Sequence, residues 1–180
     1  MKIDVVVVSC LESNCYILEK DNKVLVIDPG GYTKKIVEAI GNRKVLKVLI
    51  THQHIDHIGS VCDIMDIYKV GKLDRTSLEE KEYEIGPFRF RAIFNPGHSP
   101  CSVSYYFEND EVMFVGDFVF KGTIGRCDLE GGDYSQMKES IKKLKTYPKD
   151  TVLYPGHGDK TTLEDEIKYN PYFKKTRIKR

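Results

Sequence analysis

The histidines of this 180-residue chain are confined to three short segments, and this placement restricts both the fold and the chemistry of the protein. Each segment reads as a tight turn between structured elements. One heptapeptide holds three histidines and an aspartate: Thr51-His52-Gln53-His54-Ile55-Asp56-His57. The other candidate ligands each follow a glycine: His98, Asp117 and His157. Neutral imidazole is the commonest metal donor in proteins, so the pattern predicts a metal site built on loops.

The spacing within the heptapeptide predicts two neighbouring ions. His52 and His54 are two residues apart on a non-helical turn, so both side chains point to one side, whereas Asp56 and His57 follow a further bend. His98 would complete the donor set of one ion, and His157 would join Asp56 and His57 at the other. The carboxylate of Asp117 would lie between the two ions. Two divalent ions about 3.5–4 Å apart generate a nucleophilic hydroxide and polarise an electrophile beside it. Nitrogen and oxygen donors without cysteine favour zinc, with iron and manganese as alternatives.

Each isolated residue also has an ordinary structural interpretation. His98 and His157 follow Pro-Gly and could be turn residues, and Asp117 could cap the turn or helix after it. The heptapeptide has no such simple alternative, because its histidines and aspartate would pack poorly on a surface without a cation. We therefore treat all seven residues as candidate metal ligands.

Length and composition set the class of protein. At 180 residues the chain predicts one domain, residues 1–180, that buries roughly 70% of its unfolded surface. A net charge of +1 provides no global field for nucleic acid or an anionic membrane, which favours a small-molecule substrate. The five cysteines form no CxxC pair, and we expect them to be reduced in the cytoplasm. The basic end, residues 174–180, is interpreted as a solvated tail, or alternatively as a weak docking patch for an anionic substrate.

The apolar patterning predicts strands and helices in two similar halves. Short β-branched or aromatic runs predict strands at 5–8, 14–18, 24–27, 45–50, 88–94, 103–107, 112–115 and 151–154. Helical spacing predicts helices after a Thr33 N-cap as far as Gly41, at 59–68 and at 135–144. The charged stretch 71–82 is expected to be exposed. This order favours two sheets packed face to face with helices outside, an α/β class of fold.

The segment Thr51-His52-Gln53-His54-Ile55-Asp56-His57-Ile58-Gly59 resembles the THxHxDHxG signature of the metallo-β-lactamase superfamily. Further segments match that pattern in order: Asn14-Cys15-Tyr16, Asp28-Pro29-Gly30-Gly31, Pro96-Gly97-His98-Ser99, Gly116-Asp117 and Pro155-Gly156-His157-Gly158. The resemblance implies the αββα four-layer sandwich. It also implies two metal sites, the first with His52, His54 and His98, the second with Asp56, His57 and His157. Asp117 would be the shared, bridging carboxylate.

Within that superfamily the chain is similar to short glyoxalase II-like (hydroxyacylglutathione hydrolase-like) hydrolases, through residues 124–133 and Asn170-Pro171-Tyr172-Phe173. The resemblance implies that Arg126, nine residues after Asp117, contacts glutathione. A structural ion pair of Arg126 with Asp128 or Asp133 is the alternative.

The expected reaction is hydrolysis of a thioester such as S-lactoylglutathione by the metal-bridged hydroxide, which Asp56 would orient while ligating a metal. A thiolate leaves without prior protonation, so no strong general acid is required. Asp28 is expected to support the ligand loops rather than to bind metal. The alternatives are a persulfide dioxygenase-like enzyme with one iron on His52, His98 and Asp117, a lactonase or phosphodiesterase on the same site, and a non-enzymatic metal-binding module.

Overall fold

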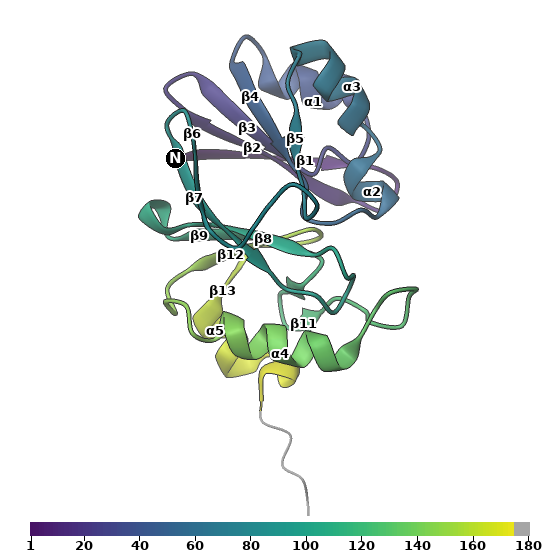
Figure 1. Cartoon of the computed structure of the whole chain (residues 1–180), viewed down its shortest axis with the longest axis vertical. Coiled ribbons are helices and arrows are strands. Elements are labelled where there is room, and N and C mark those ends of the chain that lie inside the picture. The colour runs from purple at the N-terminus through teal and green to yellow at the C-terminus, as the bar shows by residue number, and fades with distance from the viewer. Residues whose placement is uncertain (175–180) are drawn as a thin grey trace, which may run out of the picture.

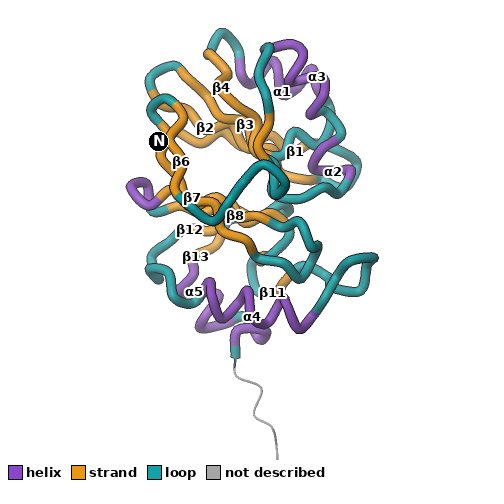
Figure 2. Tube along the Cα trace, in the orientation of Figure 1, coloured by secondary structure: helices purple, strands orange, loops and turns teal. Residues whose placement is uncertain are grey.

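The computed structural model describes residues 1–174, so the basic end at 175–180 lies outside the described residues. Within that range the chain builds two large sheets and a short hairpin (Figures 1 and 2). The first sheet runs in chain order: β1 (Lys2–Val8), β2 (Ser13–Lys20), β3 (Lys23–Ile27), β4 (Lys44–Leu49) and β5 (Lys72–Leu73). The helices beside it are α1 (Thr33–Ile40), α2 (Ile55–Ile58) and α3 (Val61–Tyr68).

The second sheet has the order β13-β12-β9-β8-β7-β6. Its strands are β6 (Glu82–Ile85), β7 (Phe88–Phe94), β8 (Val103–Phe107), β9 (Val112–Gly116), β12 (Val152–Pro155) and β13 (Thr161–Thr162). The separate hairpin pairs β10 (Val119–Phe120) with β11 (Thr123–Ile124). The remaining helices are α4 (Tyr134–Leu144) and α5 (Leu163–Tyr169), with 3-10 turns at Glu108–Asp110 and Pro171–Phe173.

Three apolar clusters show how these elements stack. The cluster between the two sheets joins side chains such as Leu25 and Ile27 to aromatic rings of the second sheet such as Phe90 and Phe107. A second cluster packs the first sheet against α1 and α3, and a third packs the second sheet against α4 and α5. Both sheets are therefore buried on both faces, which gives the four-layer αββα order that the sequence predicted.

Parallel strand pairs set the position of the loops. β3 pairs with β4 in parallel, with α1 as the crossover between them, and β9 pairs with β12 in parallel, with α4 in the crossover. The carboxyl ends of parallel strands lie at the same edge of a sheet, where ligands of open α/β sheets bind. Four loops that carry candidate ligands or Asp28 therefore leave the sandwich at one edge.

Several local predictions are corrected by the structure. Thr33 does not cap α1, since the N-cap is Tyr32 and the Thr33 hydroxyl lies 2.7 Å from Asp63 Oδ2. The stretch 71–82 is only partly exposed, because Asp74 and Leu78 are buried and β5 extends the first sheet. The predicted helix at 59–68 begins at Val61, after the separate turn α2. The short elements β6, β13 and α5 were not predicted.

Tyr105 connects the core between the sheets to the strand that leads into the heptapeptide. Its ring is fully buried, and its hydroxyl donates to the Ile50 carbonyl at 2.7 Å and lies 3.3 Å from the Leu73 carbonyl. Ile50 is followed directly by Thr51 and His52. This hydrogen bond therefore holds the end of β4 against the second sheet.

Replacing this hydroxyl tests that connection. We expect Tyr105→Phe to lower the free energy of unfolding by about 1–2 kcal/mol, because a buried carbonyl loses its donor. Tyr169→Phe, on a side chain that is 62% exposed, is the matched control and should change stability by less than about 0.5 kcal/mol. Urea denaturation of both variants provides the comparison, and equal stabilities would contradict the proposed connection.

Candidate metal centre

The seven candidate ligands converge at one edge of the sandwich. His52 and His54 follow β4, and Asp56 and His57 lie on the short helix α2. The other three follow β7, β9 and β12: His98, Asp117 and His157. Donor atoms of these residues form two groups that could each hold an ion, one of His52, His54, His98 and Asp117, the other of Asp56, His57 and His157. A third group joins Asp28 to His52 and His57. The first two contain the same residues as the two predicted donor sets.

The first group surrounds one point with three imidazoles and a carboxylate. His54 Nδ1 lies 3.1 Å from His52 Nε2 and 3.0 Å from His98 Nε2. Asp117 Oδ2 is 4.0 Å from His52 Nε2 and 3.7 Å from His98 Nε2. Four donors at roughly 2.0–2.1 Å from a tetrahedral ion are about 3.3 Å apart, so these separations match such a site.

The second group adjoins the first. Asp56 Oδ2 lies 3.4 Å from His57 Nε2 and 3.1 Å from His157 Nε2. Asp117 completes this group too, since its Oδ1 is 3.3 Å from His57 Nε2 and its Oδ2 is 3.6 Å from His157 Nε2. The carboxylate of Asp117 therefore faces both donor groups, in the position expected for a shared ligand.

Two buried atoms show that these residues fit a cation. His57 Nε2 and Asp117 Oδ1 are buried without a hydrogen-bond partner, although they lie 3.3 Å apart. A buried polar atom without a partner costs about 1–3 kcal/mol, and nearly all such atoms in folded proteins are satisfied. A divalent cation would satisfy both with its own charge, so the donor set agrees with metal binding.

The electrostatics of the cluster point the same way. Burial and the neighbouring imidazole of His57 hold the pKa of His52 well below its usual value, so His52 is neutral. Burial also lowers the pKa of His57, but the carboxylates of Asp117, Asp28 and Asp56 around the ring outweigh it and raise that pKa to about 12. Negative charge is thus concentrated around one imidazole. A metal ion bound there would displace a proton, so we expect metal affinity to fall as the pH is lowered.

Backbone carbonyls and one carboxylate orient the histidines. The Nδ1 atoms of His98 and His157 lie 2.8 Å and 3.0 Å from the carbonyl oxygens of Arg126 and Leu11. His57 Nδ1 lies 3.0 Å from Asp28 Oδ2. Carbonyl and carboxylate oxygens accept hydrogen bonds and cannot donate them. The Nδ1 atoms of His57, His98 and His157 therefore carry the proton, and their Nε2 atoms are left to bind metal.

Asp28 supports the ligand loops, as the sequence predicted. It contacts His57 directly, and it is connected to His52 through the side chain of Thr51. Asp28 Oδ1 accepts from the Thr51 amide at 2.8 Å, and Oδ2 accepts from the Thr51 hydroxyl at 2.5 Å. That hydroxyl oxygen lies 3.0 Å from His52 Nδ1. The role of Thr51 was not predicted, although its place directly before His52 was a signal for it.

The start of β2 anchors two ligand loops that are distant in sequence. Ser13 Oγ donates to the Asp56 carbonyl at 2.6 Å. Asn14 Nδ2 donates to the carbonyls of Pro155 and Gly158, at 3.1 Å and 2.9 Å. The motif around Asn14 therefore acts by holding the loops of Asp56 and His157 together.

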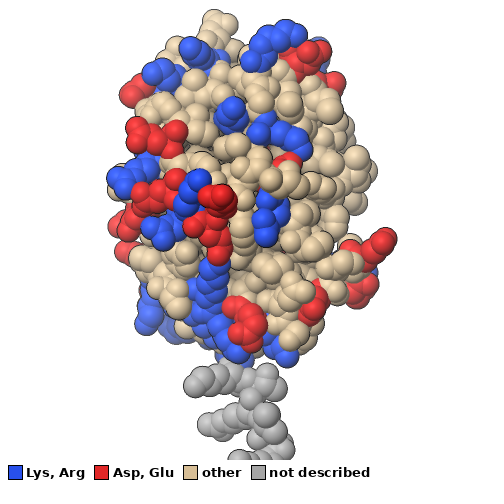
Figure 3. All heavy atoms as spheres, in the orientation of Figure 1, with Lys and Arg blue, Asp and Glu red and all other residues tan. Residues whose placement is uncertain are grey.

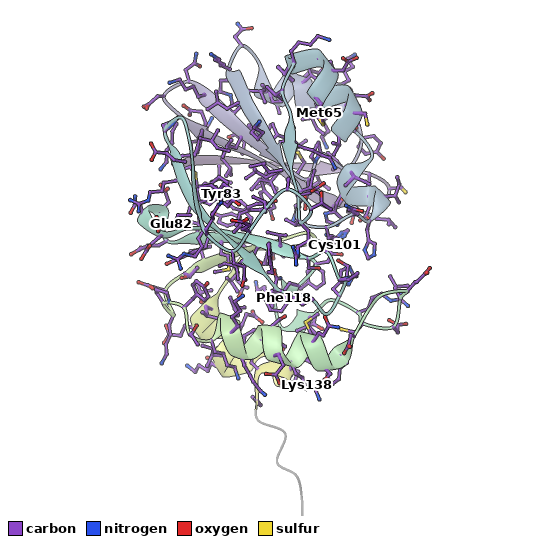
Figure 4. All side chains as sticks on the ribbon, in the orientation of Figure 1. Met65, Glu82, Tyr83, Cys101, Phe118 and Lys138 are labelled. Atoms are coloured by element: carbon purple, nitrogen blue, oxygen red, sulfur yellow. The ribbon has the colours of Figure 1, made fainter. Side chains whose placement is uncertain are left out.

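Gly156 leaves room for the shared carboxylate. A Cβ on Gly156 would lie 2.1 Å from Asp117 Oδ1 and 2.7 Å from His57 Cε1. The backbone at Asp117 is also restrained, because the next residue, Phe118, is buried between the second sheet and α4 (Figure 4). A side chain at position 156 would therefore displace the carboxylate of Asp117 or the ring of His57.

Arg126 adopts the structural alternative considered from the sequence. Its guanidinium forms a two-point ion pair with Asp128, at 2.8 Å and 2.7 Å, and both side chains are exposed. Asp133 does not join this pair, since its carboxylate caps α4. Only the backbone carbonyl of Arg126 reaches the metal cluster. Contact of its side chain with a substrate stays a prediction.

The cluster opens toward solvent on one side. His52, His57 and His98 are buried, whereas the side chains of His54, Asp56 and His157 are partly exposed. α2, which carries Asp56, and the loop between β11 and α4 both lie at the right of the molecule in Figure 1. Each donor group therefore has at least one member that solvent reaches.

The contact at Gly156 provides a test of the metal centre. We expect Gly156→Ala to reduce bound zinc from two equivalents to one or none, because the added methyl group displaces Asp117 or His57. Gly71→Ala, where a Cβ would meet only Lys47 Nζ at 3.5 Å, should keep both equivalents. Metal content after dialysis measures the outcome, and two equivalents in Gly156→Ala would contradict the assignment.

Comparisons with known proteins agree with this geometry. The family model described as the metallo-beta-lactamase superfamily matches residues 8–73 and 67–157. The hydroxyacylglutathione hydrolase GloC of Haemophilus influenzae is 30% identical, over 96% of this chain and 98% of its own length.

Two solved structures resemble the whole chain. The BLEG-1 B3 metallo-beta-lactamase has a TM-score of 0.93 and 30% identity, and the match covers 97% of this chain and all of that one. TTHA1623, solved in a di-iron-bound form, has a TM-score of 0.86 and 29% identity, over 94% of this chain and 99% of that one. The fold, the paired donor groups and the family match together show that this chain belongs to the metallo-β-lactamase superfamily and is a metal-binding hydrolase of that fold.

Proposed function

We propose that the protein is a thioester hydrolase that uses two divalent metal ions, with S-lactoylglutathione or a related thioester as substrate. One observation carries the proposal, namely that the carboxylate of Asp117 faces both donor groups. The similarity to GloC, a protein named for hydroxyacylglutathione hydrolysis, supports the choice of thioester. A bridged pair of ions suits hydrolysis at a carbonyl carbon.

The metal ligands divide into two sets in this proposal. His52, His54 and His98 would hold the first ion. Asp56, His57 and His157 would hold the second. Asp117 would be shared, because its carboxylate also lies 3.3 Å from His57 Nε2 and 3.6 Å from His157 Nε2. When bound, two such ions supply a water acidic enough to attack near neutral pH and an electrophilic centre for the carbonyl oxygen. Zinc suits these nitrogen and oxygen donors, and the di-iron form of TTHA1623 keeps iron as an alternative beside manganese.

The protein's own residues orient the reactants. Asp56 is partly exposed, and the neighbouring ring of His57 holds the pKa of Asp56 at about 2, so Asp56 is a carboxylate at neutral pH. It can accept a hydrogen bond from the attacking water and fix its direction. The departing thiol is a good leaving group as a thiolate, so no side chain is needed to protonate it.

We further infer a small-molecule partner and a single functional unit over residues 1–180. The net charge of +1 provides no attraction for nucleic acid. The cysteines are all free thiols, which supports a reducing compartment such as the cytoplasm. Within residues 1–174 no helix has the length and apolar character to cross a membrane.

Removal of the shared carboxylate is the direct test. We expect Asp117→Ala to lower kcat on S-lactoylglutathione about 100-fold or more, because the carboxylate shared by the two donor groups is removed. We expect the variant to retain one of the two metal equivalents. Asp150→Ala, at an exposed position, is the control. Full activity in Asp117→Ala would exclude the proposed mechanism. Uptake of oxygen with glutathione persulfide by a protein holding one iron would favour the dioxygenase, for which His52, His98 and Asp117 also lie together.

The ion pair of Arg126 tests whether glutathione is recognised. If Arg126 binds a glutathione carboxylate, Asp128 competes for the same guanidinium. Asp128→Asn should then lower KM for S-lactoylglutathione by up to about fivefold, because solvent screens an exposed ion pair and keeps its effect small. KM for the lactoyl thioester of N-acetylcysteamine, which has no carboxylate, should not change. Asp150→Asn is the control. An equal change for both substrates, or none, would exclude glutathione contact by Arg126.

A further inference from the structure

A buried carboxylate outside the metal cluster is saturated with hydrogen-bond donors. Glu166 on α5 is 2% exposed. Its Oε1 accepts from the Thr161 hydroxyl at 2.7 Å, and its Oε2 accepts from Asn170 Nδ2 at 2.6 Å. The Gly122 amide lies 3.2 Å and 3.0 Å from the two oxygens. Within residues 1–174 no lysine, arginine or histidine forms an ion pair with Glu166, so neutral donors alone stabilise it.

Asn170 makes the second connection of this network. Its Nδ2 also donates to the Thr123 carbonyl at 2.9 Å, while its Oδ1 accepts from the Tyr172 amide at 3.0 Å. Asn170 is fully buried. Glu166 and Asn170 therefore bind two successive residues, Gly122 and Thr123, at the turn of the β10–β11 hairpin.

The residues that flank that hairpin on both sides contact or belong to the metal cluster. β10 begins two residues after Asp117, and it pairs with β11 through Val119 and Ile124. Arg126 follows β11 by two residues, and its carbonyl oxygen lies 2.8 Å from His98 Nδ1. Gly125 packs against the same two ligands, since a Cβ there would lie 1.8 Å from the Asp117 carbonyl oxygen and 3.1 Å from His98 Cβ.

We propose that Glu166 and Asn170 are positioning residues of the metal centre, which hold the β10–β11 hairpin so that Asp117 and His98 keep their ligand geometry. The hairpin has only two residue pairs of its own, and a two-stranded hairpin is marginally stable alone. Its turn is therefore held by Glu166 on α5 and by Asn170, the residue that caps the carboxyl end of α5. The proposal rests on the proposed two-metal function, and it extends the metal centre to a helix that contributes no ligand.

The substitution Glu166→Gln tests this role. The Gly122 amide can only donate, and it faces both oxygens of Glu166. The amide nitrogen of glutamine would therefore remove one of these two contacts and break part of the network. We expect Co²⁺ titration to show one of two ions bound about tenfold more weakly, because supporting contacts of metal ligands typically contribute 10- to 100-fold in affinity. We also expect kcat on the thioester to fall while KM stays within about twofold. Glu164→Gln, exposed on the same helix, should match the wild type.

A second control separates positioning from general destabilisation. Ile64→Val removes a methyl group from the buried face of α3, in the layer packed on the first sheet. If Ile64→Val lowers Tm as much as Glu166→Gln and weakens Co²⁺ equally, the positioning role is refuted. It is refuted as well if Glu166→Gln keeps two ions at wild-type affinity.

Two further results complete the experiment. If Glu166→Gln does not fold, Thr161→Val removes a single hydrogen bond to Glu166, and it should weaken the same ion by a smaller factor. Wild-type Co²⁺ affinity at both sites in Thr161→Val would then overturn the proposal. A wild-type protein that binds two ions without cleaving thioesters would remove the proposed function and leave the positioning role to be decided by the titration.

Discussion

The structure depends on holding three carboxylates close to one buried imidazole. Asp28, Asp56 and Asp117 all contact His57, and their combined effect exceeds the cost of burying a charged ring. Like charges at such distances repel strongly where water is excluded. A divalent cation resolves this repulsion better than a proton does, because it also satisfies the unpartnered atoms of His57 and Asp117. A cation held by these residues would therefore also stabilise this edge of the sandwich.

The sandwich supplies the rigidity that such a cluster requires. Both sheets are buried on both faces, and the ligands sit on short loops at the strand ends. Charged side chains are distributed over the surface of the molecule, including the exposed loop between β11 and α4 (Figure 3). The movement of the ligands is further limited by contacts with Ser13 and Asn14 on β2, with Thr51 and with Gly156. Neither the ligands alone nor the sheets alone would define the geometry.

Much of the fold was predictable because its strands are short, apolar and separated by turn residues. The strands at 24–27, 45–50 and 112–115 were predicted close to their observed bounds, and Gly41 ends α1 as expected. The errors fall where tertiary contacts override local signals. Asp74 and Leu78 lie in a charged stretch, yet packing buries both. Helix α5 is short and carries three acidic residues in its first turn, so its apolar pattern is weak.

The sequence alone determined which side chains are candidate metal ligands, because histidines and aspartates confined to turns after strands suit a cation and contribute little to an apolar core. It also identified Asp28 as a support. Only the tertiary structure decided that Thr51 links Asp28 to His52, that Asp128 occupies the guanidinium of Arg126, and that Glu166 reaches Gly122. Each of these contacts depends on the distance between side chains in the folded chain, and residue types and spacing do not encode that distance directly.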